Sequence, residues 1–163
     1  MSDIPALAAL SAATFAGTFQ SLYSPENLSR FLGEMHSEDY YLRAYKDPSV
    51  NLFAAVQNGA LIGYAKTGPN TLPCNPPLAN ALELSRIYLA ASARSQGIGN
   101  RLMKAVIAHA KTAGRRSIVL GVFSENYAGH HFYERYGFTK IGEYDFPVGD
   151  HIDREWILRL KLQ

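Results

Sequence analysis

Cysteine and long apolar runs are nearly absent from this sequence. Its 163 residues contain one cysteine, Cys74. A lone cysteine excludes an intramolecular disulfide, so the cytoplasm is the expected location. No apolar run approaches the ~20 residues that cross a membrane, and the N-terminus lacks the basic start and apolar stretch of a signal peptide. We therefore expect no membrane partner.

A strong net charge is also missing, although one stretch lacks acidic residues altogether. The formal net charge of +2 is too small to favour nucleic acid as a partner. The window from Leu84 to Ser124 has no acidic residue and carries Arg86, Arg94, Arg101, Lys104, Lys111, Arg115 and Arg116. These side chains form either a solvated helix face or a set of cations that neutralises the phosphates of a ligand.

The composition is that of an ordinary globular protein. Apolar residues make up 47 % and charged residues 18 % of the chain. The length suffices to bury a core without metal or disulfide support. Because no repeat, low-complexity tract or linker divides the sequence, we expect one domain over residues 1–163.

Residues 82–100 run from an apolar, strand-like stretch through a short loop into a helical pattern. Ile98, Leu102 and Val106 recur at the spacing of one helix face. Backbone N–H groups in the first helical turn lack partners and carry partial positive charge, and Gly97 and Gly99 let an anion approach them. The segment therefore predicts a diphosphate site, and tight strand-to-helix packing is the alternative.

Two motifs in this half of the chain resemble a known family. Arg94-x-x-Gly97-x-Gly99 resembles the acetyl-CoA pyrophosphate loop of the GNAT superfamily of N-acetyltransferases, and residues 126–138 (NYAGHHFYERYGF) resemble that family's next signature. The resemblance implies an acetyl-CoA-dependent N-acetyltransferase that acts on an amine acceptor, without a metal. It implies cofactor contacts from Ile87, Tyr88, Leu89, Arg94, Ser95, Gln96, Gly97, Ile98, Gly99, Asn100, Arg101, Asn126 and Tyr133.

The same resemblance assigns the proton transfers to two residues. Tyr133 corresponds to the tyrosine that protonates the CoA sulfur, and core packing is its alternative role. Glu83 corresponds to a glutamate that acts as general base, often through water. An ion pair with a neighbour such as Arg86, or plain solvent exposure, is the alternative for Glu83. Strand alternation predicts Glu83, Ser85 and Ile87 on one face, opposite Leu82, Leu84 and Arg86.

Two further cofactor contacts and one metal candidate follow from the motifs. Asn126 is expected to bind the pantetheine arm or to cap its own helix. The backbone of Ile87–Leu89 resembles the segment that pairs with the pantetheine amides as an added strand would. His130 and His131 are adjacent, so on a helix they point about 100° apart and do not form a metal pair.

The order of elements predicts a mixed fold. Capping, proline and Asn-Gly signals predict helices over 4–19, 25–35 and 38–47, then a hairpin of strands 51–57 and 60–67. A proline-rich loop, 68–80, is either an active-site edge or a flexible hairpin tip. After the segment at 82–100 come strand 118–123, helix 126–136, and strands 138–146 and 152–162, joined by a turn at 147–150.

This order is similar to the GNAT fold over nearly the whole chain, which implies an α/β (α+β) architecture. The expected sheet is mostly antiparallel, with a central splayed parallel pair and flanking helices. The family's first edge strand has no counterpart here, so either the sheet has lost it or the natural protein begins upstream. Asn51–Gln57 would then be an edge, paired with another chain in a homodimer or covered by the N-terminal helices.

The acceptor is suggested by a narrower resemblance, to bacterial polyamine acetyltransferases of the PaiA type. It is carried by Thr14-Phe15, Thr18-Phe19, residues 24–28, residues 120–123, Phe146-x-x-Gly149-Asp150 and Asp153. A polyamine site needs carboxylates and aromatic rings. The expected lining is Glu26, Glu34, Glu38 and Asp39 with Tyr23, Tyr40 and Tyr41. The alternatives are a protein N-terminus, a lysine, an amino sugar, or a sensor that binds acetyl-CoA without turnover.

Overall fold

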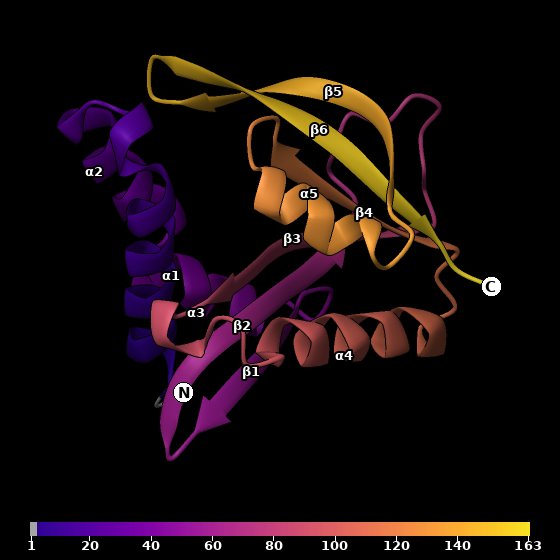
Figure 1. The fold of residues 1–163 in the computed structure, drawn as a ribbon, viewed down its shortest axis with the longest axis horizontal. Coiled ribbons are helices and arrows are strands. Elements are labelled where there is room, and N and C mark those ends of the chain that lie inside the picture. The colour runs from indigo at the N-terminus through magenta and orange to yellow at the C-terminus, as the bar shows by residue number, and fades with distance from the viewer. Residues whose placement is uncertain (1–2) are drawn as a thin grey trace.

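The computed structural model describes residues 3–163 as five α-helices and six strands around one sheet (Figure 1). The helices are α1 (Ile4–Phe19), α2 (Pro25–Met35), α3 (Glu38–Lys46), α4 (Ile98–Thr112) and α5 (Tyr127–Glu134). The strands are β1 (Asn51–Gln57), β2 (Ala60–Pro69), β3 (Ala81–Leu89), β4 (Ser117–Phe123), β5 (Thr139–Val148) and β6 (His151–Lys161). Short 3-10 turns cover Gln20–Leu22 and Ala91–Ala93.

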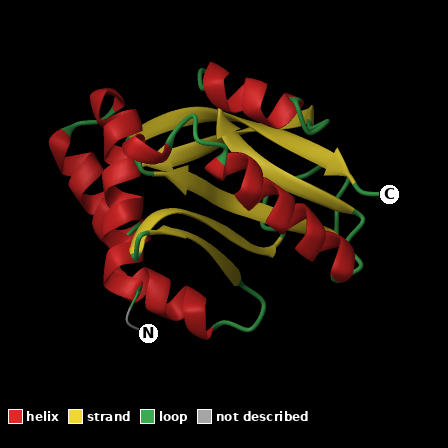
Figure 2. Cartoon of the chain, turned by 60° about the horizontal axis from the view of Figure 1, so that its bottom comes forward, coloured by secondary structure: helices red, strands yellow, loops and turns green. Residues whose placement is uncertain are grey.

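The expected mixed sheet with one parallel pair is confirmed. Its strand order is β1-β2-β3-β4-β6-β5, and every neighbouring pair is antiparallel except β3 and β4. That parallel pair meets only over Ala81–Glu83 and Ser117–Val119. The two strands are not paired beyond Glu83, which gives the expected splay in the centre of the sheet (Figure 2).

Two apolar layers cover the two faces of the sheet. One cluster joins Leu82, Leu84 and Ile118 to Met103 and Val106 of α4. The other joins Ile4, Leu7 and Tyr41 of α1 and α3 to Tyr64 of β2. In Figure 1, α1 and α2 stand at one end of the molecule, and α3 lies behind the sheet.

Element boundaries follow the predicted ones closely, with a few corrections. Asn58 and Gly59 both have positive φ, 51° and 78°, as the predicted tight hairpin turn requires. The predicted turn at 147–150 is shorter, because Pro147 and Val148 still pair with β6. Ser2-Asp3 before Ile4-Pro5 is the capping signal from which the sequence predicts the start of α1. Asp3 holds the N-cap position but makes no capping hydrogen bond through its side chain, and Ser2 lies outside the described residues.

The predicted alternation along β3 is wrong beyond Ser85. Lys66 pairs with Arg86 and Thr67 with Leu84, so Ser85 is an extra residue that forms a β-bulge. The bulge shifts the phase of the strand by one residue. Leu84 and Ile87 now share the core that α4 covers, and Arg86 turns to the opposite face, beside Tyr40 and Tyr41 of α3.

The edge of the sheet at β1 is formed as the sequence predicts. Within residues 3–163, no strand precedes β1, and β1 pairs with β2 alone. Within the same residues, no helix is long and apolar enough to cross a membrane. Pairing of this edge with a second chain stays a prediction.

Candidate active site

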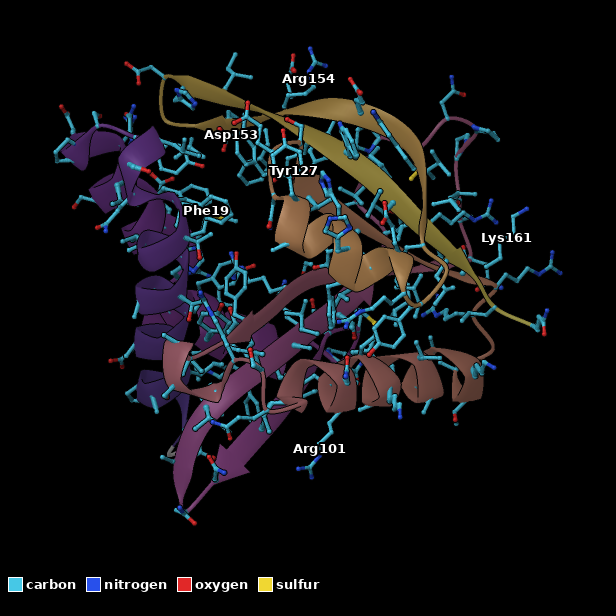
Figure 3. All side chains as sticks on the ribbon, viewed as in Figure 1. Phe19, Arg101, Tyr127, Asp153, Arg154 and Lys161 are labelled. Carbon is cyan, nitrogen blue, oxygen red and sulfur yellow. The ribbon has the colours of Figure 1, made fainter. Side chains whose placement is uncertain are left out.

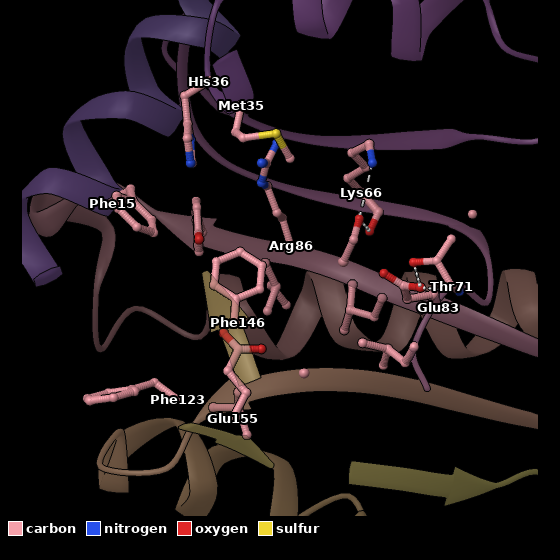
Figure 4. A pocket seen from close by; sticks show the side chains of 18 of the residues that line it. Phe15, Met35, His36, Lys66, Thr71, Glu83, Arg86, Phe123, Phe146 and Glu155 are labelled. Carbon is pink, nitrogen blue, oxygen red and sulfur yellow. Dashed lines mark hydrogen bonds between the residues drawn. The ribbon is translucent and has the colours of Figure 1, made fainter. Parts of the chain in front are cut away.

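A cavity of about 610 Å³ opens between the N-terminal helices and the splayed centre of the sheet (Figure 4). Its walls come from α1 and α2, from β2 and β3, from the loop after β2, and from β4, α5, β5 and β6. Five of the predicted site residues line it: Glu83, Ile87, Tyr88, Asn126 and Tyr133. The structure thus brings residues from opposite ends of the chain into one space.

The predicted diphosphate loop forms the first turn of α4. Gly97 is its N-cap at φ +75°, and the first intrahelical hydrogen bond runs from Arg101 N to Gly97 O. The N–H groups of the residues between them have no helical partner, as at any helix start. A Cβ at Gly97 would meet nothing within 4 Å, so the approach to this backbone is open. Arg94 and Arg101 are exposed nearby, and Figure 3 shows Arg101 pointing outward from α4. This donor set fits a diphosphate.

Gly99 lies close to two neighbouring elements. A Cβ there would meet Phe132 Cε2 at 3.4 Å and Leu89 Cδ1 at 3.5 Å, which are ordinary van der Waals distances. Helix packing, the alternative interpretation of the glycine motif, is thus visible at Gly99, and binding of an anion by this glycine stays a prediction.

The other loop positions are held by local contacts. Ser95 adopts a positive φ of 62°. Gln96 donates to Ser92 O at 2.6 Å, and Asn100 Oδ1 accepts from the Tyr136 hydroxyl at 2.8 Å. Ile98 is buried under the loop with Leu102. These contacts fix the backbone of the loop before any ligand arrives.

Ile87–Leu89 lie on β3 beyond the last residue that pairs with β4. The side of this segment that faces β4 is therefore free to pair with an extended ligand. Asn126 caps α5, since its Oδ1 accepts from Gly129 N at 3.0 Å, and it also lines the cavity. Asn126 therefore caps its own helix, as one of its two expected roles requires. This does not exclude the other expected role, binding of the pantetheine arm.

Tyr133 projects from α5 into the cavity between Phe132 and Phe138. Burial raises the pKa of its phenol, and the nearby Tyr88 and Glu155 raise it further. A phenol with a raised pKa keeps its proton at neutral pH. Tyr133 is therefore packed between these rings and carries its phenolic proton inside the cavity, and its role as the acid stays a prediction.

Glu83 has a partner that the sequence did not indicate. Its Oε2 accepts from Thr71 N at 2.6 Å and from Thr71 Oγ1 at 2.8 Å (Figure 4). The proposed alternative of an ion pair with Arg86 is wrong, because the loop after β2 folds over the strand and supplies these donors instead. Pro69, Thr71 and Pro73 also line the cavity, so the proline-rich loop is an edge of the site.

Glu155 on β6 is a candidate that sequence reasoning missed. Its carboxylate lines the cavity and accepts a hydrogen bond from the Tyr144 hydroxyl. Burial raises the pKa of Glu155 to about 7, the charges of Asp153 and Glu83 act in the same direction, and the bond from Tyr144 acts against them. A Cβ at Gly121 would collide with both partners. The glycine of the 120–123 motif therefore makes room for this pair.

Asp153, two residues earlier on the same face of β6, joins the strand to the N-terminal helices. It is 5 % exposed and accepts a hydrogen bond from the Tyr23 hydroxyl. His151 Nε2 lies 3.2 Å from its other oxygen. Near the tip of the hairpin, Asn27 donates to Asp150. These contacts hold α1 and α2 against the β5–β6 hairpin and close that end of the cavity.

The predicted acidic lining is therefore corrected. Glu26, Glu34, Glu38 and Asp39 do not line the cavity, although Tyr23 and Tyr40 do, and Tyr41 is fully buried in the core. The acidic wall consists instead of Glu83, Asp153 and Glu155, and a fourth acidic residue, Asp47, lines the cavity apart from them. Alternation along 152–162 is the one sequence signal for it, because Asp153 and Glu155 are two residues apart on a strand.

A basic wall faces part of the same cavity. Arg86 and Lys66 line it with His36, and Figure 4 draws all three on the side of the cavity opposite Glu155. His36 Nδ1 and Ser11 Oγ share a hydrogen bond of 2.6 Å. Burial, together with the charge of Arg86, lowers the pKa of His36 to about 3, so its ring is neutral at physiological pH.

The histidine pair has separate surroundings. His130 is buried and stacks on Trp156 with ring centroids 4.3 Å apart. His131 is exposed beside Glu134. No cluster of three metal-ligating side chains occurs in the described part of the chain.

The sequence and the fold were compared with known proteins. Residues 17–138 match the family described as "Acetyltransferase (GNAT) family". An uncharacterized N-acetyltransferase in the pepI 3' region of Lactobacillus delbrueckii subsp. lactis is 29% identical over 160 residues, covering 98% of this chain and 92% of the relative. A PaiA N-acetyltransferase from Thermoplasma acidophilum in complex with coenzyme A has a TM-score of 0.77 at 22% identity, covering 99% of this chain and 94% of that chain. The ribosomal-protein-S18-alanine N-acetyltransferase from Escherichia coli has a TM-score of 0.63 at 22% identity, covering 77% and 76%.

Proposed function

We propose that this chain, which belongs to the GNAT family of acetyltransferases and is an acetyl-CoA-dependent N-acetyltransferase, acetylates a small primary amine bound in the cavity described above. We take residues 1–163 as one catalytic domain. The observation that carries this proposal is that Tyr133, Glu83 and Glu155 line the same cavity as the free side of Ile87 and Tyr88.

The cofactor is proposed to lie along the splayed strand and the start of α4. The N–H groups of the first turn of α4, with Arg94 and Arg101, would hold its diphosphate. The backbone of Ile87–Leu89 and the side chain of Asn126 would bind its pantetheine arm. Acetyl-CoA supplies the thioester whose acetyl carbon the amine attacks. No metal enters this proposal.

The two proton transfers are proposed to fall to two different groups that line the cavity. An aliphatic amine has a pKa near ~10, so it arrives as an ammonium and must lose a proton. Glu155 accepts that proton, because a carboxyl with a pKa of about 7 is half ionised at neutral pH and is matched to this task. Tyr133 donates its phenolic proton to the departing sulfur. Glu83, held by Thr71, is the second candidate for the base.

The acidic wall supports a cationic acceptor. The three carboxylates of the acidic wall line the cavity together with several aromatic rings, among them Phe15, Tyr23 and Phe146, and such groups bind ammonium ions. The polyamines spermidine and spermine, suggested by the PaiA-type sequence resemblance, are therefore the first acceptors to test. A protein N-terminus, a lysine and an amino sugar are the other classes, since relatives of this fold include an enzyme named for ribosomal-protein alanine.

A thiol-release assay with a panel of acceptors tests the activity. Release of CoA with an amine but not without one is the expected result. Acetyl-CoA binding without release with any amine would make the domain a sensor. For a polyamine, KM should rise steeply with salt, because screening weakens the attraction to the acidic wall. Equal, salt-independent turnover of spermidine and a neutral-tailed monoamine would exclude the polyamine acceptor.

A further inference from the structure

Arg86 is a buried cation on the wall of the cavity. Its residue is 8 % exposed, and its guanidinium lies 4.5 Å from the centroid of the Tyr40 ring. Nη1 donates to the Tyr41 hydroxyl at 2.9 Å. Within residues 3–163, no carboxylate forms an ion pair with it. A guanidinium has five N–H donors and stays charged, and burying such a charge unpaired is costly.

A hydroxyl network holds this guanidinium in place. Tyr41 and Tyr64 bond each other at 2.6 Å, and Ser11 Oγ bonds both, at 2.6 and 2.7 Å. All three side chains are at most 1 % exposed. The network ties α1, α3 and β2 together beneath Arg86, so the position of the cation is fixed by the core.

Lys66 adds a second cation on the same wall. Its Nζ lies 5.3 Å from the centroid of the Tyr40 ring and 3.3 Å from Ser85 Oγ. Asp47 also lines the cavity on this side, and its carboxylate accepts bonds from Ser49 N at 2.8 Å and Ser49 Oγ at 2.6 Å. These bonds, and to a smaller extent the charge of Lys66, lower the pKa of Asp47. The β3 bulge is what turns Arg86 to this face, so the cavity has one basic wall and one acidic wall.

We propose that Arg86, assisted by Lys66, binds a carboxylate of the acceptor, so that the acceptor is a compact amine that also carries a carboxylate. This rests on the proposed N-acetyltransferase activity but not on a polyamine acceptor. Arg86 supplies the forked donors that match a carboxylate, and the acidic wall receives the ammonium end. A polyamine has no group for the basic wall and would be the poorer substrate.

Matched acceptor pairs test this inference. The probes are L-leucine against L-leucinamide, and 4-aminobutyrate against 4-aminobutanamide, with spermidine and propylamine in the same CoA-release assay. In the wild type, at least one acid should exceed its amide in kcat/KM by about tenfold or more. Acids and amides used equally would overturn the inference. CoA release with none of the amines would overturn the proposed activity instead, so the two failures are distinguishable.

Variants of Arg86 and Lys66 test whether these residues cause the preference for an acid over its amide. Arg86→Met should raise KM for the acid until the acid and the amide are equivalent, with the KM for acetyl-CoA unchanged. Arg86→Lys should keep part of the preference, and Lys66→Met, which changes a half-exposed side chain, should reduce it about threefold. Lys161→Met, at the exposed end of β6, is the control. A preference that survives both Arg86→Lys and Lys66→Met unchanged would overturn the assignment, even if Arg86→Met fails to fold.

Discussion

The proposed cofactor side and the proposed acceptor side of the site are built from the chain in different ways. The proposed cofactor side is largely one contiguous stretch, Arg94 to Arg101, whose geometry follows from a helix start and a left-handed glycine. The proposed acceptor side is the cavity, which joins Tyr23, Glu83, Arg86 and Glu155 from distant parts of the chain. Local backbone rules thus specify the first side, and strand register specifies the second.

The largest expected effect comes from the group that serves both sides. Tyr133→Phe removes one hydroxyl and keeps the ring between Phe132 and Phe138, so folding and acetyl-CoA binding should persist. Loss of a general acid typically costs about 10²–10⁴-fold, and it should appear in kcat with little change in KM for acetyl-CoA. Steady-state kinetics measure both. Full kcat in this variant would leave Tyr133 as a packing residue.

A pair of variants distinguishes the roles of Glu155 and Glu83 on the acidic wall. Glu155→Gln should lower kcat/KM by about 10²-fold. It should also remove the rise of activity with pH that is centred near 7, because the base works only when ionised. Glu83→Gln should keep that rise, since Thr71 would still hold the amide in place. Activity profiles from pH 5 to 9 decide between them. A profile flattened by Glu83→Gln alone would assign the base to Glu83.

The cofactor side can be tested without disturbing the acceptor side. Gly97→Asn should fold, because asparagine tolerates positive φ and the added atoms meet no protein atom within 4 Å. The side chain would stand where the diphosphate approaches, so affinity for acetyl-CoA should fall by about tenfold or more, ~1.4 kcal/mol. Calorimetric titration measures it.

Gly114→Asn is the matched control for that experiment. It has φ +64° and an equally open environment, but it follows the C-terminal end of α4. Gly99→Val is less informative, because its side chain would strike Phe132 and Leu89. Unchanged affinity in folded Gly97→Asn would contradict the assignment of the loop.

A smaller effect is expected from the partner of Glu155. The hydrogen bond from Tyr144 lowers the pKa of Glu155 against its burial. Tyr144→Phe should therefore raise that pKa and move the acidic limb of the pH profile upward. A bond of about 1 kcal/mol corresponds to a shift of about 0.7 pH unit. The high-pH plateau of kcat should remain. A limb that stays in place, or moves downward, would show that another group controls it.

The smallest effect on catalysis is expected at the edge of the sheet. We predict that β1 pairs with another chain, since its uncharged edge pairs with β2 on one side only. Val56 is 62 % exposed there, so Val56→Lys should favour the monomer without changing kcat. Ultracentrifugation and hydrogen exchange measure this. A wild-type monomer with fast-exchanging β1 amides would contradict the prediction.

The sequence by itself determined the element order, the family and the position of the glycine loop before α4, where we propose that a diphosphate binds. These depend on signals that act over a few residues: Pro25 and Ser24 at a helix start, Asn58-Gly59 in a hairpin, and Gly97 before α4. Such signals report backbone preferences that do not need a partner from elsewhere in the chain.

Only the tertiary structure decided which charges face the cavity. The bulge at Ser85 depends on how β3 pairs with β2, and it moved Arg86 to the opposite face and Ile87 into the core. The pairing of β6 with β4 placed Glu155 above Gly121, while Glu26 and Glu34 on α2 stayed outside. A shift of one residue reverses the face of every later side chain in a strand, and no local pattern in the sequence encodes it.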